Sequence, residues 1–208
     1  MSKLVLLRHG QSQWNLENRF TGWNDIGLSE KGVLEAKESG RLIKEKKIPI
    51  DAVYSSELKR ANDTAIIAMK EANYDHLFND GELIMTKNIA VNERDYGDLT
   101  GLNKQETAEK YGKEQVHTWR RSYDVQPPGG ESLKNVVERV KPYFENTIKK
   151  DLEDEKSILL SAHGNSLRAL FLILNFYTTE TISTAEIPTG KPFIIEYENN
   201  KITNKYFL

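Results

Sequence analysis

Two short apolar runs along the chain end in the same polar pattern. Residues 4–7 are all apolar and lead into Arg-His-Gly at 8–10, while the largely apolar residues 158–162 lead into His-Gly at 163–164. An apolar run of this length, closed by a turn signal, is typical of a strand buried on both faces of a parallel sheet. Ligands of open α/β sheets bind beyond the carboxyl ends of such strands. If the two strands are parallel neighbours, their histidines face each other at that edge.

The rest of the pattern alternates between strand-like and helix-like segments. Apolar residues recur at helical spacing on one face of several segments, and Ser29 is a good N-cap for the first of them. Pro142, inside the third, removes a backbone donor and predicts a kink. We expect helices over residues 30–47, 57–73, 131–152 and 166–176, further strands over 51–56 and 89–92, and a closing hairpin over 192–198 and 202–208. This alternation predicts an α/β fold, a three-layer α/β/α sandwich with a largely parallel central sheet.

Two polar stretches lie outside this alternation. Residues 11–24 read as a long loop in which Trp14, Phe20 and Trp23 are apolar anchors. Residues 97–130 are polar, helical in pieces and end in Pro-Pro-Gly-Gly, and long ordered stretches of this kind are often functional. We interpret residues 97–130 as an excursion that covers the edge of the sheet, within a single domain of residues 1–208.

Composition narrows the classes of function. The chain has 208 residues, a formal net charge of −2 and no cysteine. The charge does not indicate a nucleic-acid or membrane surface, and the lack of cysteine removes disulfides and thiolate chemistry. The first apolar run is too short for a signal peptide, and no stretch is long enough to span a membrane. We therefore expect a cytoplasmic protein that attracts anions only through local clusters.

Candidate functional side chains gather where the predicted strands end. Arginine dominates among them, and its planar guanidinium binds phosphate oxygens in pairs and keeps its charge. Helix N-termini after Ser56 and Gly164 add backbone donors for an anion. The side chains at or beyond the strand ends are Arg8, His9, Asn15, Arg60, Glu93, His163 and Asn165, with Arg120 and Arg121 from the excursion. This set predicts a phosphate pocket that contains two histidines and one carboxylate.

A histidine in such a pocket can attack phosphorus and carry the phosphoryl group as phosphohistidine. The arginines and the second histidine would spread the charge of the transferring oxygens, and Glu93 would exchange protons with the leaving and attacking oxygens. This scheme requires no metal. The motifs of dinucleotide sites, P-loops, nucleophile elbows and zinc helices are absent or incomplete in the sequence.

Each of these residues also has an ordinary structural explanation. Arg8 suits a surface ion pair, Glu93 and Arg94 suit a pair on a solvated loop, and adjacent arginines on a helix most often face solvent. We favour the functional interpretation because so many of the residues converge on one edge of the sheet. His76 and His117 lie in polar surroundings without an evident partner, and we interpret them as structural.

Arg-His-Gly near the start, followed by a late His-Gly, resembles the signature of the histidine phosphatase superfamily. Within that superfamily the sequence is similar to the cofactor-dependent phosphoglycerate mutases over nearly its whole length. The segments that carry the resemblance are RHGQSQWN at 8–15, NRFTGWND at 18–25, SSELKRA at 55–61, NERDYGDLTGLNK at 92–104, AEKYG at 108–112, WRRSYDVQPP at 119–128, SAHGNSLRAL at 161–170 and IPTGKP at 187–192.

The resemblance implies roles for individual residues. His9 would be the phosphorylated nucleophile, Glu93 the proton donor and acceptor, and His163, with Arg8 and Arg60, the group that stabilises the phosphoryl in transfer. The implied reaction interconverts 3-phosphoglycerate and 2-phosphoglycerate in glycolysis and gluconeogenesis, primed by 2,3-bisphosphoglycerate and without a metal, in a homodimer. The implied substrate-binding residues are Arg8, Gly10, Gln11, Ser12, Gln13, Trp14, Asn15, Thr21, Gly22, Arg60, Glu93, Arg94, Asp95, Tyr96, Lys104, Arg120, Arg121, Gly164 and Asn165.

The sequence departs from the family pattern in three places. Gln11 stands where the family usually has glutamate, and Asp95 stands where it usually has histidine. The segment between Pro128 and Glu131 is much shorter than in longer members, which also extend further at the C-terminus. A more open pocket would admit water, so a phosphomonoester phosphatase of the same superfamily is the alternative function. A non-catalytic module that binds phosphorylated ligands is less favoured, because binding alone needs no nucleophile.

Overall fold

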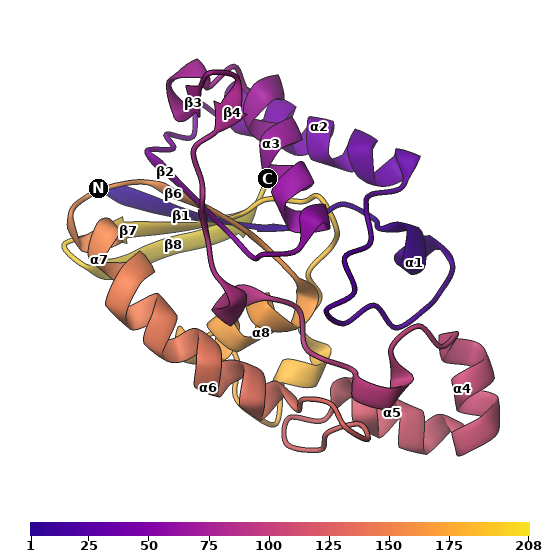
Figure 1. The fold of residues 1–208 in the computed structure, drawn as a ribbon. Helices are drawn as coiled ribbons and strands as arrows, with labels where there is room; N and C mark the ends of the chain where they lie inside the picture. Colours follow the sequence, from indigo (N-terminus) through magenta and orange to yellow (C-terminus); the bar gives the residue numbers. More distant parts are fainter.

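The structure is a computed structural model that describes residues 1–208. Its centre is a six-stranded sheet with the strand order β5-β2-β6-β1-β7-β8 (Figure 1). The strands of this sheet are β1 (Ser2–Arg8), β2 (Ala52–Ser55), β5 (Thr86–Lys87), β6 (Ile158–Ala162), β7 (Phe193–Glu198) and β8 (Lys201–Phe207). The strands from β5 to β1 run parallel, and β7 and β8 extend the sheet as an antiparallel hairpin. The prediction of a largely parallel sheet is confirmed.

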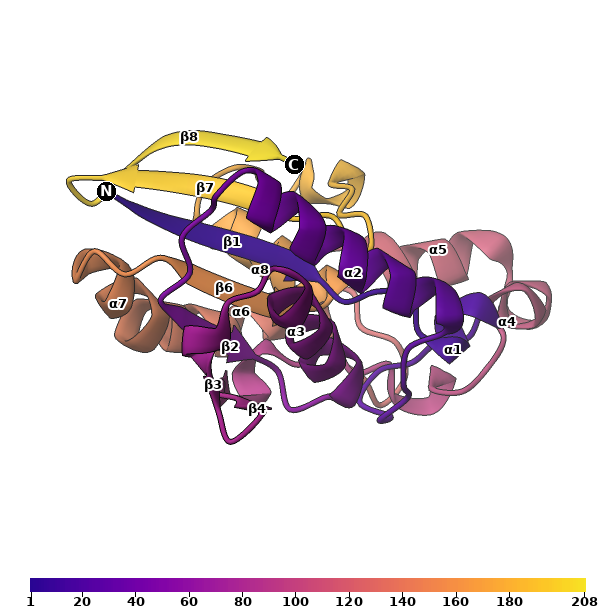
Figure 2. The same ribbon diagram turned by 90° about the horizontal axis from the view of Figure 1, so that it is seen from above.

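Helices cover both faces of the sheet (Figures 1 and 2). One face packs against α2 (Glu30–Glu45) and α3 (Lys59–Glu71), and the other against α6 (Leu133–Tyr143), α7 (Lys149–Glu153) and α8 (Gly164–Ile173). Successive side chains of a strand point to opposite faces. Leu4 and Leu6 of β1 accordingly join the core on the α6 and α8 side, while Val5 joins the core on the α2 and α3 side. The predicted three-layer sandwich is confirmed.

The closing hairpin also forms as predicted, with Asn199 and Asn200 between β7 and β8. Their φ angles are 50° and 60°. A two-residue hairpin turn of this hand needs positive φ at both positions, which asparagine tolerates better than most residues. A small separate pair of strands, β3 (Phe78–Asn79) and β4 (Glu82–Leu83), follows the short helix η1 (Asp75–Leu77).

The strand predicted at residues 89–92 is wrong. The strand that pairs with β2 on the side away from β6 is β5, and it ends at Lys87. The side chain of Asn88 then accepts a hydrogen bond from the backbone N–H of Ala90 at 2.8 Å, which starts the 3₁₀ turn η2 (Ile89–Val91). Such a side-chain hydrogen bond competes with the backbone hydrogen bonds of a strand. The pattern of apolar residues carries no information about this hydrogen bond, so it predicted a strand.

The helix predicted over 131–152 is interrupted rather than continuous. Ser132 caps α6, and a π-helical turn at Phe144–Ile148 separates α6 from α7. Pro142 lies just before this turn and lacks the backbone N–H that the α-helical ladder would use. The predicted disturbance at the proline therefore takes the form of a widened turn.

The excursion lies beyond the carboxyl ends of the parallel strands (Figure 1). It contains η3 (Gly97–Leu99), α4 (Lys104–Tyr111) and α5 (Lys113–Arg121), and it faces the loop that holds α1 (Gln13–Leu16). A small apolar cluster of Phe20, Leu99 and Val116 joins the loop to the excursion. The short helix η5 (Ile182–Thr184) follows α8 along the chain.

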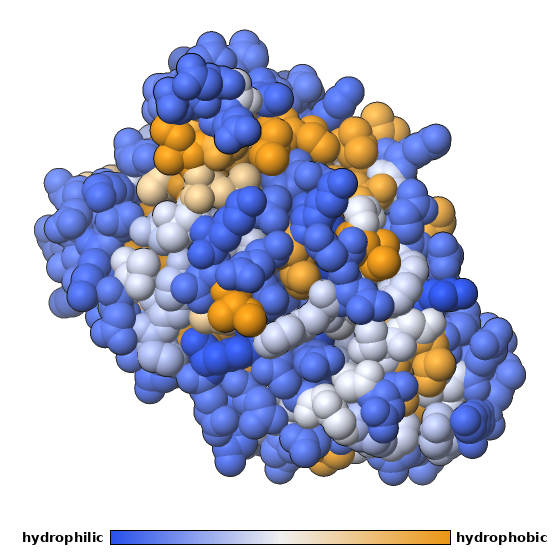
Figure 3. Space-filling model, in the orientation of Figure 1, coloured by the Kyte–Doolittle hydropathy of each residue, from blue (hydrophilic) through white to orange (hydrophobic).

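Polar side chains cover most of the face seen in Figure 3, and apolar side chains gather near α2 and α3 at its top. No helix in the structure combines the length and the apolar character needed to cross a membrane.

Candidate active site

The two His-Gly sequences meet because β1 and β6 are parallel neighbours. The ladder between them runs from Leu4 opposite Ile158 to Arg8 opposite Ala162, and the backbone N–H of His9 continues it to the carbonyl oxygen of Ala162 at 3.0 Å. The rings of His9 and His163 consequently lie 4.9 Å apart between centroids, and both are buried. The predicted meeting of the two histidines at one edge of the sheet is confirmed.

The environment of His9 keeps its imidazole neutral. Its Nδ1 lies 2.7 Å from the carbonyl oxygen of Gly10, which can only accept, so we assign the ring proton to Nδ1 and a lone pair to Nε2. Burial, together with the positive charges of Arg60 and Arg8, holds the pKa of His9 well below its usual value. At neutral pH His9 thus has an unprotonated Nε2, as a nucleophile requires.

His163 sits at the N-terminus of α8, where its Nε2 lies 2.8 Å from the hydroxyl oxygen of Ser56. Burial holds the pKa of His163 well below its usual value, and the positive charges of Arg60, Arg8 and Arg139 act in the same direction. Its Nδ1 is buried without a hydrogen-bond partner in the protein. An anionic group beside the two rings would reverse these charge effects and favour protonation.

Glu93 follows η2 and is held by one of its two carboxylate oxygens. Oε1 accepts hydrogen bonds from the backbone N–H of Arg94 at 2.8 Å, and from the backbone and side-chain nitrogens of Asn165 at 3.1 and 3.0 Å. Burial raises the pKa of Glu93, but the Arg94 N–H and the charges of Arg60 and Arg8 outweigh it and leave the pKa lowered. The free protein therefore holds an ionised carboxylate beside the two histidines.

Arg8 and Arg60 present unsatisfied donors to the same space. Nη1 of Arg8 donates to the carbonyl oxygen of Ile187, and the two Nη atoms of Arg60 donate to those of Asn24 and Gly22. The Nε atom of each arginine is buried without a partner. Buried donors without acceptors are costly, and the oxygens of a bound anion would satisfy them. Burial nevertheless lowers the pKa of Arg60 only to about 10, so its charge persists at neutral pH.

These side chains surround a cavity of about 140 Å³ with a strongly cationic lining. The predicted residues that line it are Arg8, His9, Asn15, Thr21, Gly22, Arg60, Glu93, Tyr96, Lys104, Arg120, Arg121, Gly164 and Asn165. They come from loops, from the end of β1 and from helix ends that are far apart in the sequence. A small ligand with more than one anionic group suits such a cavity, because several cations and few apolar side chains line it.

Other predicted residues lie behind the cavity. The N–H of Gly10 donates to the hydroxyl of Thr64, and the N–H of Gln11 donates to a carboxylate oxygen of Glu35. Ser12 caps α1. These residues therefore hold the loop that follows β1, and they do not line the cavity.

Gln13 and Trp14 are two more predicted residues that lie in the loop after β1. Gln13 is exposed, and its side chain donates to the carbonyl oxygen of Leu28 at 3.4 Å. The guanidinium of Arg19 lies 5.8 Å from the centre of the Trp14 ring, and this ring lies close to Gly101 of the excursion. Neither residue lines the cavity.

Arg94 and Asp95 flank the cavity without lining it. Arg94 is fully buried, donates to the carbonyl oxygen of Arg120 at 3.1 Å and lies 4.8 Å from the centre of the Tyr96 ring. Asp95 accepts a hydrogen bond from the backbone N–H of Gly97 at 2.9 Å and so shapes the start of the excursion. The aspartate at this position thus serves a local turn.

Three residues that line the cavity, Arg19, Phe20 and Arg168, were missed by the sequence analysis. Arg168 lies four residues after Gly164 on α8, and side chains on a helix lean toward its N-terminus. This spacing is the signal that would have placed Arg168 near the cavity. Arg19 and Phe20 follow an irregular loop, and only the fold brings them inward.

No group of three or more His, Asp or Glu side chains is arranged in a way that would hold a metal ion. The cationic lining instead fits phosphorylated small molecules, including one with two phosphates and a carboxylate.

Comparison with known proteins identifies related sequences. Residues 4–207 match the family model of the histidine phosphatase superfamily (branch 1). A 2,3-bisphosphoglycerate-dependent phosphoglycerate mutase from Parvibaculum lavamentivorans is 49% identical over 196 residues, which cover 94% of this chain and 90% of that protein. The protein of the same name from Methylocella silvestris is 51% identical over 191 residues, 92% of this chain and 90% of that protein.

Solved structures share the fold at lower identity. A mycobacterial glucosyl-3-phosphoglycerate phosphatase, solved with VO3, superimposes with a TM-score of 0.78 at 25% identity and covers 94% of this chain and 93% of its own. The Bacillus stearothermophilus protein YhfR superimposes with a TM-score of 0.79 at 24% identity, over 98% of this chain and 95% of its own. The fold thus serves proteins whose names denote different reactions.

Proposed function

The chain belongs to the histidine phosphatase superfamily (branch 1) and is about half identical to 2,3-bisphosphoglycerate-dependent phosphoglycerate mutases, and on that premise we propose that it interconverts 3-phosphoglycerate and 2-phosphoglycerate through phosphohistidine. The observation that carries the proposal is the neutral His9, which lies against His163 and lines a cavity rich in cations.

In the first step, Nε2 of His9 attacks a phosphorus atom of 2,3-bisphosphoglycerate. The P–N bond forms as the P–O bond to the glycerate breaks, and Glu93 passes to the leaving oxygen a proton that it takes up from solvent, because the negative charge of the bound bisphosphate raises the pKa of its carboxyl. Arg8, Arg60 and His163 stabilise the charge on the three oxygens of the transferring group. The product of this step is phosphorylated His9 with a monophosphoglycerate in the cavity.

In the return step, a hydroxyl of the monophosphoglycerate attacks the phosphohistidine. Glu93 accepts the proton of that hydroxyl, the P–O bond forms, and the P–N bond breaks. Because the bisphosphate intermediate can donate either of its phosphates to His9, its reorientation exchanges the 2- and 3-isomers. Lys104, Arg120 and Arg121 would hold the far end of the ligand in either orientation.

The decisive assay measures interconversion of the two isomers with and without 2,3-bisphosphoglycerate, for the wild type and for His9→Ala. We expect activity that the cofactor stimulates, and loss by at least about 1,000-fold in the variant, because the nucleophile itself is gone. A variant that retains wild-type turnover would contradict the phosphohistidine mechanism.

A phosphomonoester phosphatase is the second candidate. It is supported by the fold shared with the glucosyl-3-phosphoglycerate phosphatase. In this reaction water, rather than a substrate hydroxyl, would take the phosphoryl group from His9. Rapid release of phosphate from 3-phosphoglycerate, with no 2-phosphoglycerate formed, would favour it over the mutase.

We also propose that the reaction needs no metal and that the protein works in the cytoplasm as a homodimer. The similarity to the cofactor-dependent phosphoglycerate mutases supports this proposal. Excess chelator is expected to leave turnover unchanged, since arginines and histidines supply all the positive charge in the proposed scheme. Light scattering on the purified protein measures the mass of the assembly, and a monomeric mass would overturn the dimer.

A further inference from the structure

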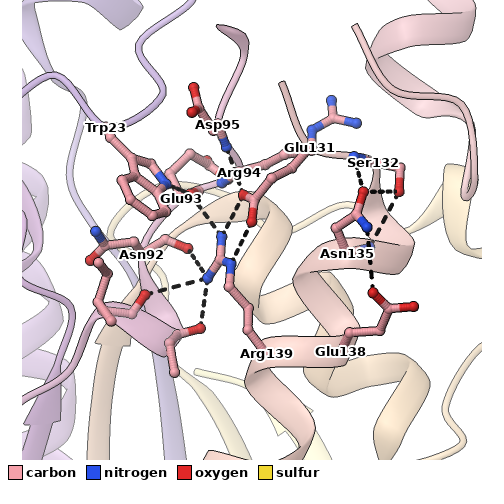
Figure 4. A network of polar contacts seen from close by, with 12 residues as sticks. Trp23, Asn92, Glu93, Arg94, Asp95, Glu131, Ser132, Asn135, Glu138 and Arg139 are labelled. Atoms are coloured by element: carbon pink, nitrogen blue, oxygen red, sulfur yellow. Dashed lines mark hydrogen bonds and ion pairs between the residues drawn. The ribbon is translucent and has the colours of Figure 1, made fainter. Parts of the chain in front are cut away.

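Arg139 and Glu131 form a polar network behind Glu93, and neither side chain lines the cavity (Figure 4). Arg139 comes from α6, and Glu131 lies just before that helix. Their side chains are joined by two hydrogen bonds, from Nε to Oε1 at 2.8 Å and from Nη2 to Oε2 at 2.9 Å. The pair is about one-fifth exposed, so it is partly shielded from solvent. Bidentate pairing of this kind fixes the plane of the guanidinium.

The remaining donors of Arg139 all bind the backbone that leads into Glu93. Nη1 donates to the carbonyl oxygens of Ala90 at 2.6 Å and Asn92 at 3.1 Å, and Nη2 donates to that of Glu93 at 3.0 Å. All five N–H groups of the guanidinium are therefore used. The carbonyl groups of Ala90 and Asn92 belong to the segment 89–92 that was predicted to be a strand, and Arg139 supplies donors that a neighbouring strand would otherwise supply.

Two further contacts complete the support of Glu93. The indole N–H of Trp23 donates to the carbonyl oxygen of Glu93 at 2.6 Å, and the backbone N–H of Asp95 donates to Oε2 of Glu131 at 2.9 Å. The backbone is thus held on both sides of Glu93, while its Oε1 is held from the front by Arg94 and Asn165. Only the second carboxylate oxygen is left for proton transfer.

We propose that Arg139, oriented by Glu131, is a positioning residue that sets the place of the Glu93 carboxylate relative to His9. The inference rests on the proposed role of Glu93 in proton transfer. The carboxylate must reach the oxygen that leaves or attacks, and a displacement of about 1 Å costs on the order of 100-fold in rate. Arg139 touches neither ligand nor reacting atoms; its hydrogen bonds act on the backbone at Glu93, and its charge also contributes to the lowered pKa of His163.

A double-mutant cycle tests this dependence. Arg139→Met keeps much of the side-chain volume and removes the guanidinium with its five donors. We expect kcat of this variant to fall about 10- to 100-fold while KM changes by less than about threefold. Glu93→Gln is expected to lose about 100- to 10,000-fold in kcat. If Arg139 acts only through Glu93, the double variant is no slower than Glu93→Gln alone. Losses that multiply, or a rise in KM with unchanged kcat, would overturn the proposal.

Controls separate positioning from folding. Arg41→Met removes an exposed arginine that pairs with Glu38 and Glu45 on α2, and it is expected to leave kcat unchanged. If thermal melts show that Arg139→Met does not fold, the cycle is run with Arg139→Lys, which keeps the charge but cannot reproduce five directed donors.

The outcome for Arg139 can be separated from that of the proposed function. If the wild type releases phosphate without isomerisation, the mutase proposal fails, and the cycle is then measured on phosphate release. Glu93 protonates the leaving oxygen in both reactions, so the same loss of additivity is expected.

Discussion

At the scale of single residues, the free site is arranged to keep two histidines uncharged. His9 and His163 are buried beside Arg8 and Arg60, so protonation of either ring would place another positive charge in a space that already holds two. Each of the two arginines also has a buried Nε donor without a partner in the protein, which is a further cost. The protein thus stores an unfavourable local arrangement that a bound phosphate would relieve.

This arrangement predicts a dependence of stability on pH. The folded-state pKa of each histidine lies well below the unfolded value of 6.5, so the unfolded chain binds more protons as the pH falls below that value. Without phosphate, we expect the free energy of unfolding to fall from pH 7.5 to 5.5, by up to about 1.4 kcal/mol per pH unit for each histidine. Urea titrations at several pH values measure the slope.

His9→Asn provides the comparison for this slope. It removes one of the two depressed histidines and is expected to lower the pH dependence by about half over the same range. An unchanged slope in His9→Asn would show that other groups cause the effect.

At the scale of elements, the loop after β1 is held in place by the first turn of α2. A Cβ atom on Gly32 would lie 2.1 Å from the carbonyl oxygen of Gln11, so the helix and the loop touch backbone to backbone. The neighbouring contact is reciprocal, because a Cβ on Gly10 would lie 2.3 Å from the carbonyl oxygen of Gly32. The position of His9 therefore depends on a helix that contributes no side chain to the cavity.

We expect Gly32→Ala to destabilise the protein and slow catalysis. Alanine favours a helix by up to about 1 kcal/mol over glycine, but overpacking against rigid backbone costs about 1 to 3 kcal/mol or more. The net effect of the substitution is therefore a loss of stability. Gly27→Ala is the matched control, since a Cβ there meets no atom within 4 Å. Denaturant melts and kcat on both variants check the prediction, and equal stability of the two would refute it.

At the scale of the whole molecule, attraction of the substrate is local. The net charge is −2, yet Arg8, Arg19, Arg60, Lys104, Arg120, Arg121 and Arg168 all line one cavity. A cavity whose charges are mostly of one sign focuses the field on the ligand, and here Glu93 is the only acidic residue among the cations. The acidic side chains that balance these cations are spread over the remaining surface, where solvent screens them.

This distribution predicts that KM for 3-phosphoglycerate rises several-fold between about 20 and 200 mM salt, although the whole protein is negative. Arg121→Gln removes one cation of the cavity and is expected to raise KM at low salt and to weaken this dependence. Arg41→Gln removes an arginine from the outer surface of α2 and should change neither property. Identical salt profiles for Arg121→Gln and the wild type would contradict a local origin.

Local sequence alone determined the alternation of strands and helices, the hairpin at Asn199 and Asn200, and the place of His9 and His163 at the ends of their strands. Each follows from residue type and spacing, because burial on both faces and parallel pairing leave few other arrangements. Only the tertiary structure decided where β5 ends and that Arg168 lines the cavity. It also decided that Arg139 binds the backbone at Glu93. These features depend on which distant segments become neighbours, and donors and acceptors so far apart in sequence find each other only once the core has packed.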